Sequence, residues 1–277
     1  MNRLFVVNKP IFKSSNNYMY DIKNRYKTKK VGFSGTLDPF ATGCLIVATG
    51  QFTKLFQYLK KTPKCYRATL WLGASSPTLD IEKFEKVVPL NAFKEKVVDD
   101  VMQSFVGDLT YLPPKYSAKK INGIRAYQLA VGNKDVNLKE ITSTIFSIQL
   151  LSYHHPFVHF EIEVSEGAYI RSIGAIIAQK LGVDGILSSL KRVREGAFYF
   201  DHERSLNPID FLDLPRNRHL GDDEYITLGK KLDIKYFENQ QNGIYLVEYG
   251  SFFAIIEIID GIISYKLNRI LKVKESH

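Results

Sequence analysis

The stretch GFSGTLDPFATG, residues 32–43, places one aspartate between two turns marked by glycine. Asp38 is the only acidic residue from position 22 to position 79, although that segment contains ten lysines and arginines. The following proline restricts Asp38 to extended backbone, while Gly35 and Gly43 can adopt the positive φ angles of tight turns. The stretch therefore predicts a stiff loop that presents one ionised carboxylate as a base or nucleophile. A plain turn aspartate is the alternative interpretation.

The composition limits the classes of protein to consider. The chain has 277 residues, 45% of them hydrophobic, which is enough for one large domain or a domain with a small appendage. Its net charge is +9, and the first 200 residues alone carry +12. A basic surface of this kind favours a polyanionic partner, either a nucleic acid or an anionic membrane.

Other features argue against metal and membrane classes. The two cysteines, Cys44 and Cys65, are too few for a zinc site or a disulfide framework and fit a reducing cytosol. No signal peptide is recognisable, and no window approaches the roughly 20 apolar residues of a membrane span. We therefore expect a soluble cytoplasmic protein that needs no metal.

Short apolar or alternating runs separated by turn signals predict strands at LFVVNKP, CLIVATG, CYRATLWLG, TSTIFSIQLLSY, FVHFEIEV and GAFYFD. Helical spacing is seen at QFTKLFQYLKK, at LNAFKEKVVDDVMQSFVG through Phe93, Val97, Val101 and Phe105, and at AYIRSIGAIIAQKLG. Because strands dominate and helices interrupt them irregularly, we expect an α+β fold with a mixed, largely antiparallel sheet.

A domain boundary is expected within residues 207–224, where proline and clustered acids replace the strand pattern. The short β runs that follow are separated by glycines. We therefore predict a main domain at 1–215 and a small β-rich module at 216–277, which is near the lower size limit for independent stability.

Two further residues each allow a structural and a functional interpretation. Tyr66 heads the strand YRATLWLG, where it is either a core tyrosine or an aromatic ring that stacks on a base. Arg171 lies in the first turn of a predicted helix after SEGAY, where it is either solvated or paired with a carboxylate or a phosphate.

Two basic stretches suggest RNA contacts. PPKYSAKKINGIRAYQLAVG, residues 113–132, interleaves tyrosines with cations, and LKRVREG, residues 190–196, adds three more cations near a turn. Such runs are often solvated faces, but rings among cations favour RNA because bases stack while cations neutralise phosphates.

Taken together, these segments resemble the TruB-type tRNA pseudouridine synthases. The matching motifs are GFSGTLDPFATG, KCYRATLWLG, SSPTLDIE, the 113–132 pattern, VSEGAYIRSIGAIIAQKLG and LSSLKRVREGAF, which occur in the family's order over about residues 4–200. Any one of these motifs would be weak evidence, whereas the ordered set is specific.

The resemblance implies a fold, a reaction and a partner. The fold is the pseudouridine synthase mixed sheet with flanking helices, followed by a small PUA-like module. The reaction is the conversion of uridine to pseudouridine at position 55 in the T loop of tRNA, without an organic cofactor or a metal. The expected partner is the T stem-loop of tRNA, bound by a monomer.

The resemblance also assigns roles to residues. Asp38 is the catalytic aspartate, Tyr66 stacks on the target base and takes part in proton transfer, and Arg171 pairs with the aspartate. The expected substrate-binding residues are Lys9, Phe33, Gly35, Thr36, Tyr116, Lys119, Leu190, Lys191 and Arg192, with Leu190 as an apolar side of the pocket.

Some positions depart from the family's pattern. Phe33 replaces a histidine, which keeps a ring but loses the imidazole hydrogen bonds. Glu166 and Ala168 stand where lysine and threonine are usual, and Lys83 replaces a glycine. The alternatives are a non-catalytic RNA-binding protein on the same scaffold, a guide-RNA-directed catalytic subunit and a basic membrane-surface protein; the last predicts a cationic amphipathic helix that the sequence does not show.

Overall fold

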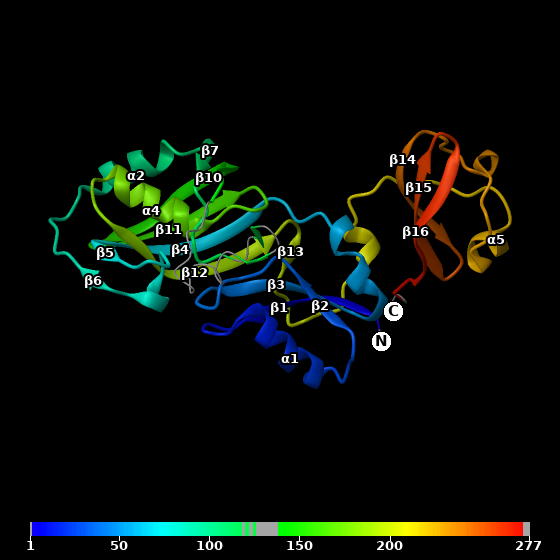
Figure 1. The fold of residues 1–277 in the computed structure, drawn as a ribbon, viewed down its shortest axis with the longest axis horizontal. Coiled ribbons are helices and arrows are strands. Elements are labelled where there is room, and N and C mark those ends of the chain that lie inside the picture. Colours follow the sequence, from blue (N-terminus) through cyan, green and yellow to red (C-terminus); the bar gives the residue numbers. More distant parts are fainter. Residues whose placement is uncertain (1, 118–119, 122–123, 126–137, 274–277) are drawn as a thin grey trace.

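The computed structural model describes residues 2–117, 120–121, 124–125 and 138–273. A nine-stranded sheet forms the main body, with β1, β3, β12, β4, β11, β10 and β7 in that order and β2 and β13 added to β3 and β12 (Figure 1). The only parallel pairing among these strands joins β12 to β3. The sheet strands are β1 Arg3–Lys9, β2 Val31–Ser34, β3 Thr42–Thr49, β4 Lys64–Leu72, β7 Gly107–Tyr111, β10 Ile141–His154, β11 Phe157–Val164, β12 Gly185–Glu195 and β13 Phe198–Tyr199. The expected α+β fold with a mixed, largely antiparallel sheet is confirmed.

Strands β1 and β3 are buried on both faces. Phe5 and Val7 point into one core with Leu45, whereas Leu4 and Val6 pack into a second core on the opposite face. This alternation follows from the period of two in a strand. It explains why both strands appear in the sequence as continuous apolar runs.

Three helices cover the first core: α1 Ser15–Arg25, α2 Glu95–Gln103 and α4 Ile170–Lys180. Helix α4 was predicted from its helical spacing, whereas α1 was not predicted. Of the face predicted for α2, Phe93, Val101 and Phe105 pack against the first core, but Val97 is 43% exposed. Val98 and Met102, which were not predicted, are fully buried. The apolar stripe of α2 is wide, and its centre rather than its edge faces the sheet.

Two other local predictions need correction. The segment predicted as a helix after β3 forms two 3-10 turns, η1 Gly50–Lys54 and η2 Phe56–Tyr58. Phe52 and Leu55 are buried and three residues apart, which fits the period of a 3-10 turn. The segment 190–196 is next to a turn, as expected, but most of it belongs to the central strand β12. The predicted strand GAFYFD is reduced to the two residues of β13.

Short elements complete the main body: the strand pairs β5 Ala74–Ser75 with β6 Lys86–Val87 and β8 Lys120–Ile121 with β9 Ile124–Arg125, and the 3-10 turns η3 Ile81–Lys83 and η4 Pro208–Phe211.

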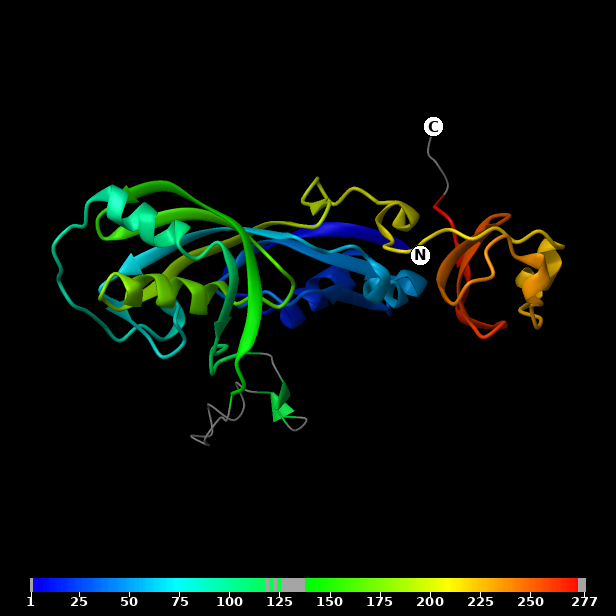
Figure 2. The same cartoon turned by 90° about the horizontal axis from the view of Figure 1, so that it is seen from above.

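The C-terminal segment forms a separate three-stranded antiparallel sheet, as Figure 2 shows at one end of the long main body. Its elements are α5 Asp223–Leu228, η5 Ile234–Tyr236, β14 Gly243–Tyr249, β15 Phe252–Ile259 and β16 Ile262–Leu271. One face has its own core around Phe237 and Val247. The other face contributes Phe253 and Ile255 to the second core of the main body, so the small sheet is stabilised by that contact. Among the described residues, no helix is long and apolar enough to cross a membrane.

Candidate active site

Asp38 lies in the loop between β2 and β3. Gly35 and Gly43, on either side of it, have φ angles of +67° and +102°, which glycine adopts without strain. A Cβ atom on Gly43 would lie 2.3 Å from the Arg192 carbonyl oxygen, so the loop packs directly on β12. The backbone N–H of Ala41 donates to the Asp38 carbonyl at 3.1 Å. The loop is therefore tightly constrained, as the sequence predicted.

Arg171 binds Asp38. Helix α4 begins at Ile170, and its first turn directs the Arg171 guanidinium toward the loop. Nε lies 2.8 Å from Asp38 Oδ2, and the guanidinium is buried while the Asp38 side chain is 34% exposed. The structure thus places together the aspartate and the arginine that the resemblance had paired. A partly exposed carboxylate fixed by a buried cation can act on a substrate that reaches its exposed side.

The remaining nitrogens of Arg171 have partners of their own. Nη1 donates to the Thr78 carbonyl at 2.7 Å and lies 3.2 Å from Asp80 Oδ2, and Nη2 donates to the Tyr116 carbonyl at 2.9 Å. With its donors held in several directions, the guanidinium cannot rotate freely. Its position fixes the position of the Asp38 carboxylate.

Asp80 is the buried counterpart of Asp38. Its side chain is 1% exposed and accepts hydrogen bonds from the Thr78 hydroxyl at 2.6 Å and from the Glu82 backbone N–H at 3.0 Å. Burial raises the pKa of the Asp80 carboxyl, and the Thr78 hydrogen bond and the charge of Arg171 oppose that rise. Asp80 thus orients Arg171 through a buried carboxylate. Asp80 lies in the SSPTLDIE motif, but no feature of the sequence distinguished it as a site residue.

A second group of charges lies beneath the loop; we call Lys64, Arg192 and Glu195 the loop-support cluster. Arg192 donates from Nε to the Cys44 carbonyl and from Nη2 to the Gly35 carbonyl, both at 2.8 Å. These two carbonyls lie at opposite ends of the Asp38 loop, so one guanidinium ties the ends together. Glu195 lies 3.2 Å from Arg192 and 3.3 Å from Lys64 Nζ, and its side chain is 0% exposed.

Arg192 therefore differs from its expected role. It was expected to contact RNA as one of several surface cations, but the structure buries it to 1% exposure. Burial lowers the pKa of Arg192, but the nearby Tyr66 and Glu195 more than compensate and raise it above its ordinary value. The sequence could not show this, because Arg192 and its carbonyl partners at Gly35 and Cys44 are about 150 positions apart.

Lys9 is also buried and lies next to the loop. Its ammonium donates to the carbonyls of Pro39, Lys13 and Pro10 at 3.1, 2.6 and 2.8 Å. Burial lowers the pKa of Lys9 from 10.5 to about 8, although the charge of Asp38 opposes the change. Lys9 was expected to bind substrate; the structure instead has it join the N-terminal segment to the residue after Asp38.

Tyr66 lies in β4, where it pairs in register with Arg192 of β12 and Ile162 of β11. It is buried within the first core. Its ring is thus close to the cation that holds the Asp38 loop, and its stacking role stays a prediction.

The other expected site residues are more scattered. Thr36 and Lys191 are exposed, Leu190 is buried in the first core, and Gly35 contacts the loop-support cluster. Phe33 is half-buried in β2, and the Lys83 ammonium lies 4.4 Å from the Tyr116 ring centroid. Lys119 lies outside the described residues.

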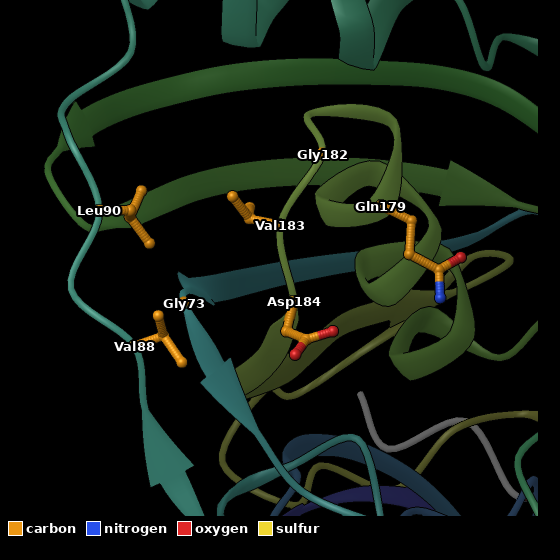
Figure 3. Close-up of a pocket in the computed structure, with 7 residues that line it drawn as sticks. All are labelled: Gly73, Val88, Leu90, Gln179, Gly182, Val183 and Asp184. Atoms are coloured by element: carbon orange, nitrogen blue, oxygen red, sulfur yellow. The ribbon is translucent and has the colours of Figure 1, made fainter.

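A cavity of about 530 Å³ lies at the other end of β4, lined by Val88, Leu90, Val183 and Asp184 among others (Figure 3). Gly73, which also lines it, is seven residues beyond Tyr66, or roughly 23 Å along a strand. This cavity has no residue in common with the Asp38 site. Among the described residues, no group of His, Cys, Asp or Glu is arranged to hold a metal ion.

The arrangement of strands has close structural counterparts. A chain of the solved Cbf5-Nop10-Gar1 complex superposes with a TM-score of 0.64 at 20% identity, covering 98% of this chain and 84% of that one. A chain of an H/ACA RNP bound to a substrate RNA containing 2′-deoxyuridine gives 0.63 at 20% identity, with 99% and 86% covered. At this identity the likeness concerns the fold alone.

Sequence comparison defines the family more narrowly. Residues 23–170 match the model of the TruB family pseudouridylate synthase N-terminal domain. The tRNA pseudouridine synthase B of Sulfurovum sp. (strain NBC37-1) is 60% identical over 276 residues, covering 100% of both chains. The protein of the same name from Campylobacter curvus (strain 525.92) is 50% identical over 272 residues, covering 98% of this chain and 100% of the relative. The chain belongs to the TruB family of pseudouridylate synthases.

Proposed function

We propose that the protein converts uridine to pseudouridine in tRNA and that its target is the T-loop uridine at position 55. Full-length relatives at up to 60% identity are named tRNA pseudouridine synthase B. The observation that carries the proposal is the Asp38 carboxylate, which is partly exposed yet fixed by Arg171 at 2.8 Å.

The reaction is balanced within the substrate. The N1–C1′ bond of uridine breaks, the base turns, and C5 bonds to C1′; the C5 proton leaves to solvent and N1 gains a proton. No electron is gained or lost overall. A carboxylate beside the ribose serves each of three routes: attack on C1′, addition to the base, or removal of a ribose proton.

The uridine must leave its stack to reach this carboxylate. A loop nucleotide costs less to unstack than a paired one, and proteins hold such a base by stacking it on an aromatic ring while cations bind the phosphates. Tyr66 supplies the ring in our proposal. The exposed Lys191, on the strand that supports the Asp38 loop, is suited to a phosphate.

We further infer that the enzyme acts on the T stem-loop as a monomer in the cytoplasm. In this view residues 1–215 form the catalytic domain and residues 216–277 a reduced PUA-like module. The separate sheet β14–β16 supports the division. The net charge of +9 supports a direct approach to RNA without a second protein.

The test is to incubate the purified protein with an unmodified tRNA transcript and to map pseudouridine by carbodiimide-dependent reverse-transcription stops. A stop at the T-loop uridine that is absent without protein is the expected result. RNA binding without any stop would instead indicate a binding protein on this scaffold, and a stop elsewhere would overturn the assigned position.

A further inference from the structure

Helix α1 has an exposed face suited to RNA. Tyr18, Met19 and Ile22 are buried on one side, while Asn16, Tyr20 and Lys23 recur at intervals of four and three residues on another side. Residues at this spacing share one face of a helix. The Tyr20 side chain is 64% exposed, and the Lys23 ammonium lies 5.6 Å from its ring centroid. An aromatic ring, an amide and a cation are thus aligned toward solvent.

This face borders a hollow of about 520 Å³ between α1 and β2, which Figure 1 shows alongside each other. The α1 side contributes Asn16, Asn17, Met19, Tyr20 and Lys23, and the β2 side contributes Val31, Gly32 and Phe33. A volume of a few hundred Å³ is typical of sites for one small molecule or nucleotide. A Cβ on Gly32 would lie 3.1 Å from the Phe56 ring, so a larger residue there would crowd this strand.

The hollow adjoins the candidate active site through β2. Phe33 pairs with Val47 of β3 and precedes Asp38 by five residues, which span at most about 18 Å of extended chain. Phe33, which lines the hollow, and Asp38 are therefore no more than about 18 Å apart. The chain has no acid between Asp21 and Asp38, and Lys27, Lys29 and Lys30 are exposed nearby. The surroundings favour phosphate.

We propose that this α1–β2 hollow binds one unstacked nucleotide of the single-stranded RNA that flanks the target uridine. Tyr20 stacks on its base, Asn16 and Asn17 offer amides to the base edge, and Lys23 binds its phosphate. The inference rests on the proposed function, because the ligand is part of the same RNA. It adds a contact outside the catalytic centre that contributes to binding and not to the bond-breaking step.

The test compares Tyr20→Ala, Tyr20→Phe and wild type, each as the whole chain, on an unmodified T stem-loop RNA with tritium at uridine C5. Filter binding gives Kd, and release of tritium from C5 gives turnover. Because stacking of one base on an aromatic ring contributes to the free energy of binding, Tyr20→Ala should raise Kd and KM roughly 5- to 150-fold. The kcat at saturating RNA should stay within about twofold, and Tyr20→Phe should bind as wild type. A Lys23→Gln variant should lower the slope of log affinity against log salt concentration by about one, which corresponds to the loss of one phosphate contact.

Tyr225→Ala is the matched control. Tyr225 is 50% exposed and has the Lys230 ammonium 4.8 Å from its ring, but it lies on α5 in the C-terminal sheet region and does not line this hollow. Unchanged Kd and KM for Tyr20→Ala, or a loss equal to that of Tyr225→Ala, would overturn the proposal. Wild-type turnover in the same assay separates this outcome from a failure of the proposed function.

A second measurement locates the nucleotide. A benzophenone amino acid introduced at position 20 should crosslink, under light, to one loop nucleotide next to the target uridine. Crosslinks spread over the base-paired stem would show a general phosphate contact and would contradict a nucleotide site.

Discussion

Two arginine–carboxylate groups contact the Asp38 loop, and they differ in whether solvent can reach a carboxylate. In the first group, Arg171 lies between the buried Asp80 and the 34% exposed Asp38. In the second, Arg192 and Lys64 enclose Glu195, which is 0% exposed. A carboxylate can react with a substrate only when the substrate can reach it. We therefore propose that the Asp38 group carries out the chemistry and that the Glu195 group supports the loop.

Asp38→Asn should have the largest effect. The amide has nearly the shape of the carboxylate but cannot act as base or nucleophile, so kcat should fall on the order of 10⁴-fold or more. RNA affinity should stay within about threefold, because the variant loses no binding surface. Tritium release from tRNA labelled at uridine C5 measures turnover, since C5 loses its hydrogen when it joins C1′. Appreciable turnover would show that Asp38 is not the reacting group.

Glu195→Gln should affect folding stability most. The change leaves Arg192 and Lys64 without their buried counter-charge, which costs about 3–5 kcal/mol in comparable buried pairs. Chemical denaturation measures the free energy of unfolding. The control is Glu163→Gln, which breaks the partly exposed pair with Arg194 and should cost about 1 kcal/mol or less. If both variants lost the same free energy of unfolding, Glu195 would be no more important for stability than the partly exposed Glu163.

Arg171→Lys tests whether the shape of the guanidinium, and not only its charge, positions Asp38. A lysine ammonium cannot hold Asp38, Asp80 and two carbonyls in the directions that the guanidinium spans. The Asp38 carboxylate should shift, and kcat should fall about 10²-fold with a smaller change in KM. Steady-state kinetics on tRNA gives both values. A lysine variant with wild-type kcat would show that the charge alone matters.

Gly35→Ala tests how closely the loop packs on its support. Its φ is +67°, and an added Cβ would lie 2.9 Å from both Glu195 carboxylate oxygens. Gly182→Ala has a similar φ of +80° with no atom within 4 Å, so it reports the backbone cost alone, about 1–2 kcal/mol. Gly35→Ala should cost more than this control in thermal unfolding and should also lower kcat. Identical unfolding shifts would mean that the contact adds nothing.

Lys9 should give an effect that is seen as a dependence on pH. Its pKa is about 8 in the fold and 10.5 without burial, so between these values the unfolded chain binds more protons at this site. The contribution of Lys9 to stability should therefore rise as pH increases from 8 to 10.5. The difference in unfolding free energy between wild type and Lys9→Met measures it. A difference that is constant over this range would contradict the lowered pKa.

The sequence predicted the Asp38 loop because its determinants are local: two glycines and a proline within twelve residues. The pairing of Asp38 with Arg171 came from the resemblance, since the two residues are far apart in the chain. Strand β12 was missed because charged residues usually mark a surface, whereas here Arg192 and Glu195 are buried by pairing with each other. Helix α1 was missed because its apolar residues are few.

Asp80 and Glu195 could not be identified from single positions. Both act through contacts made only after the sheet has formed: Asp80 with Arg171 on α4, and Glu195 with Lys64 on β4. Long-range ion pairs of this kind leave no periodic signal in the sequence. The same holds for the Arg192 contacts with the carbonyls of Gly35 and Cys44.

The most direct measurement compares Asp38→Asn and Glu195→Gln in two assays, tritium release at saturating tRNA and the free energy of unfolding. We predict opposite outcomes: Asp38→Asn abolishes turnover and unfolds like wild type, while Glu195→Gln loses stability and keeps measurable turnover at a temperature where it is folded. If Asp38→Asn still turned over substrate, or if both variants lost turnover to the same extent while folded, the separation of chemistry from support would be wrong.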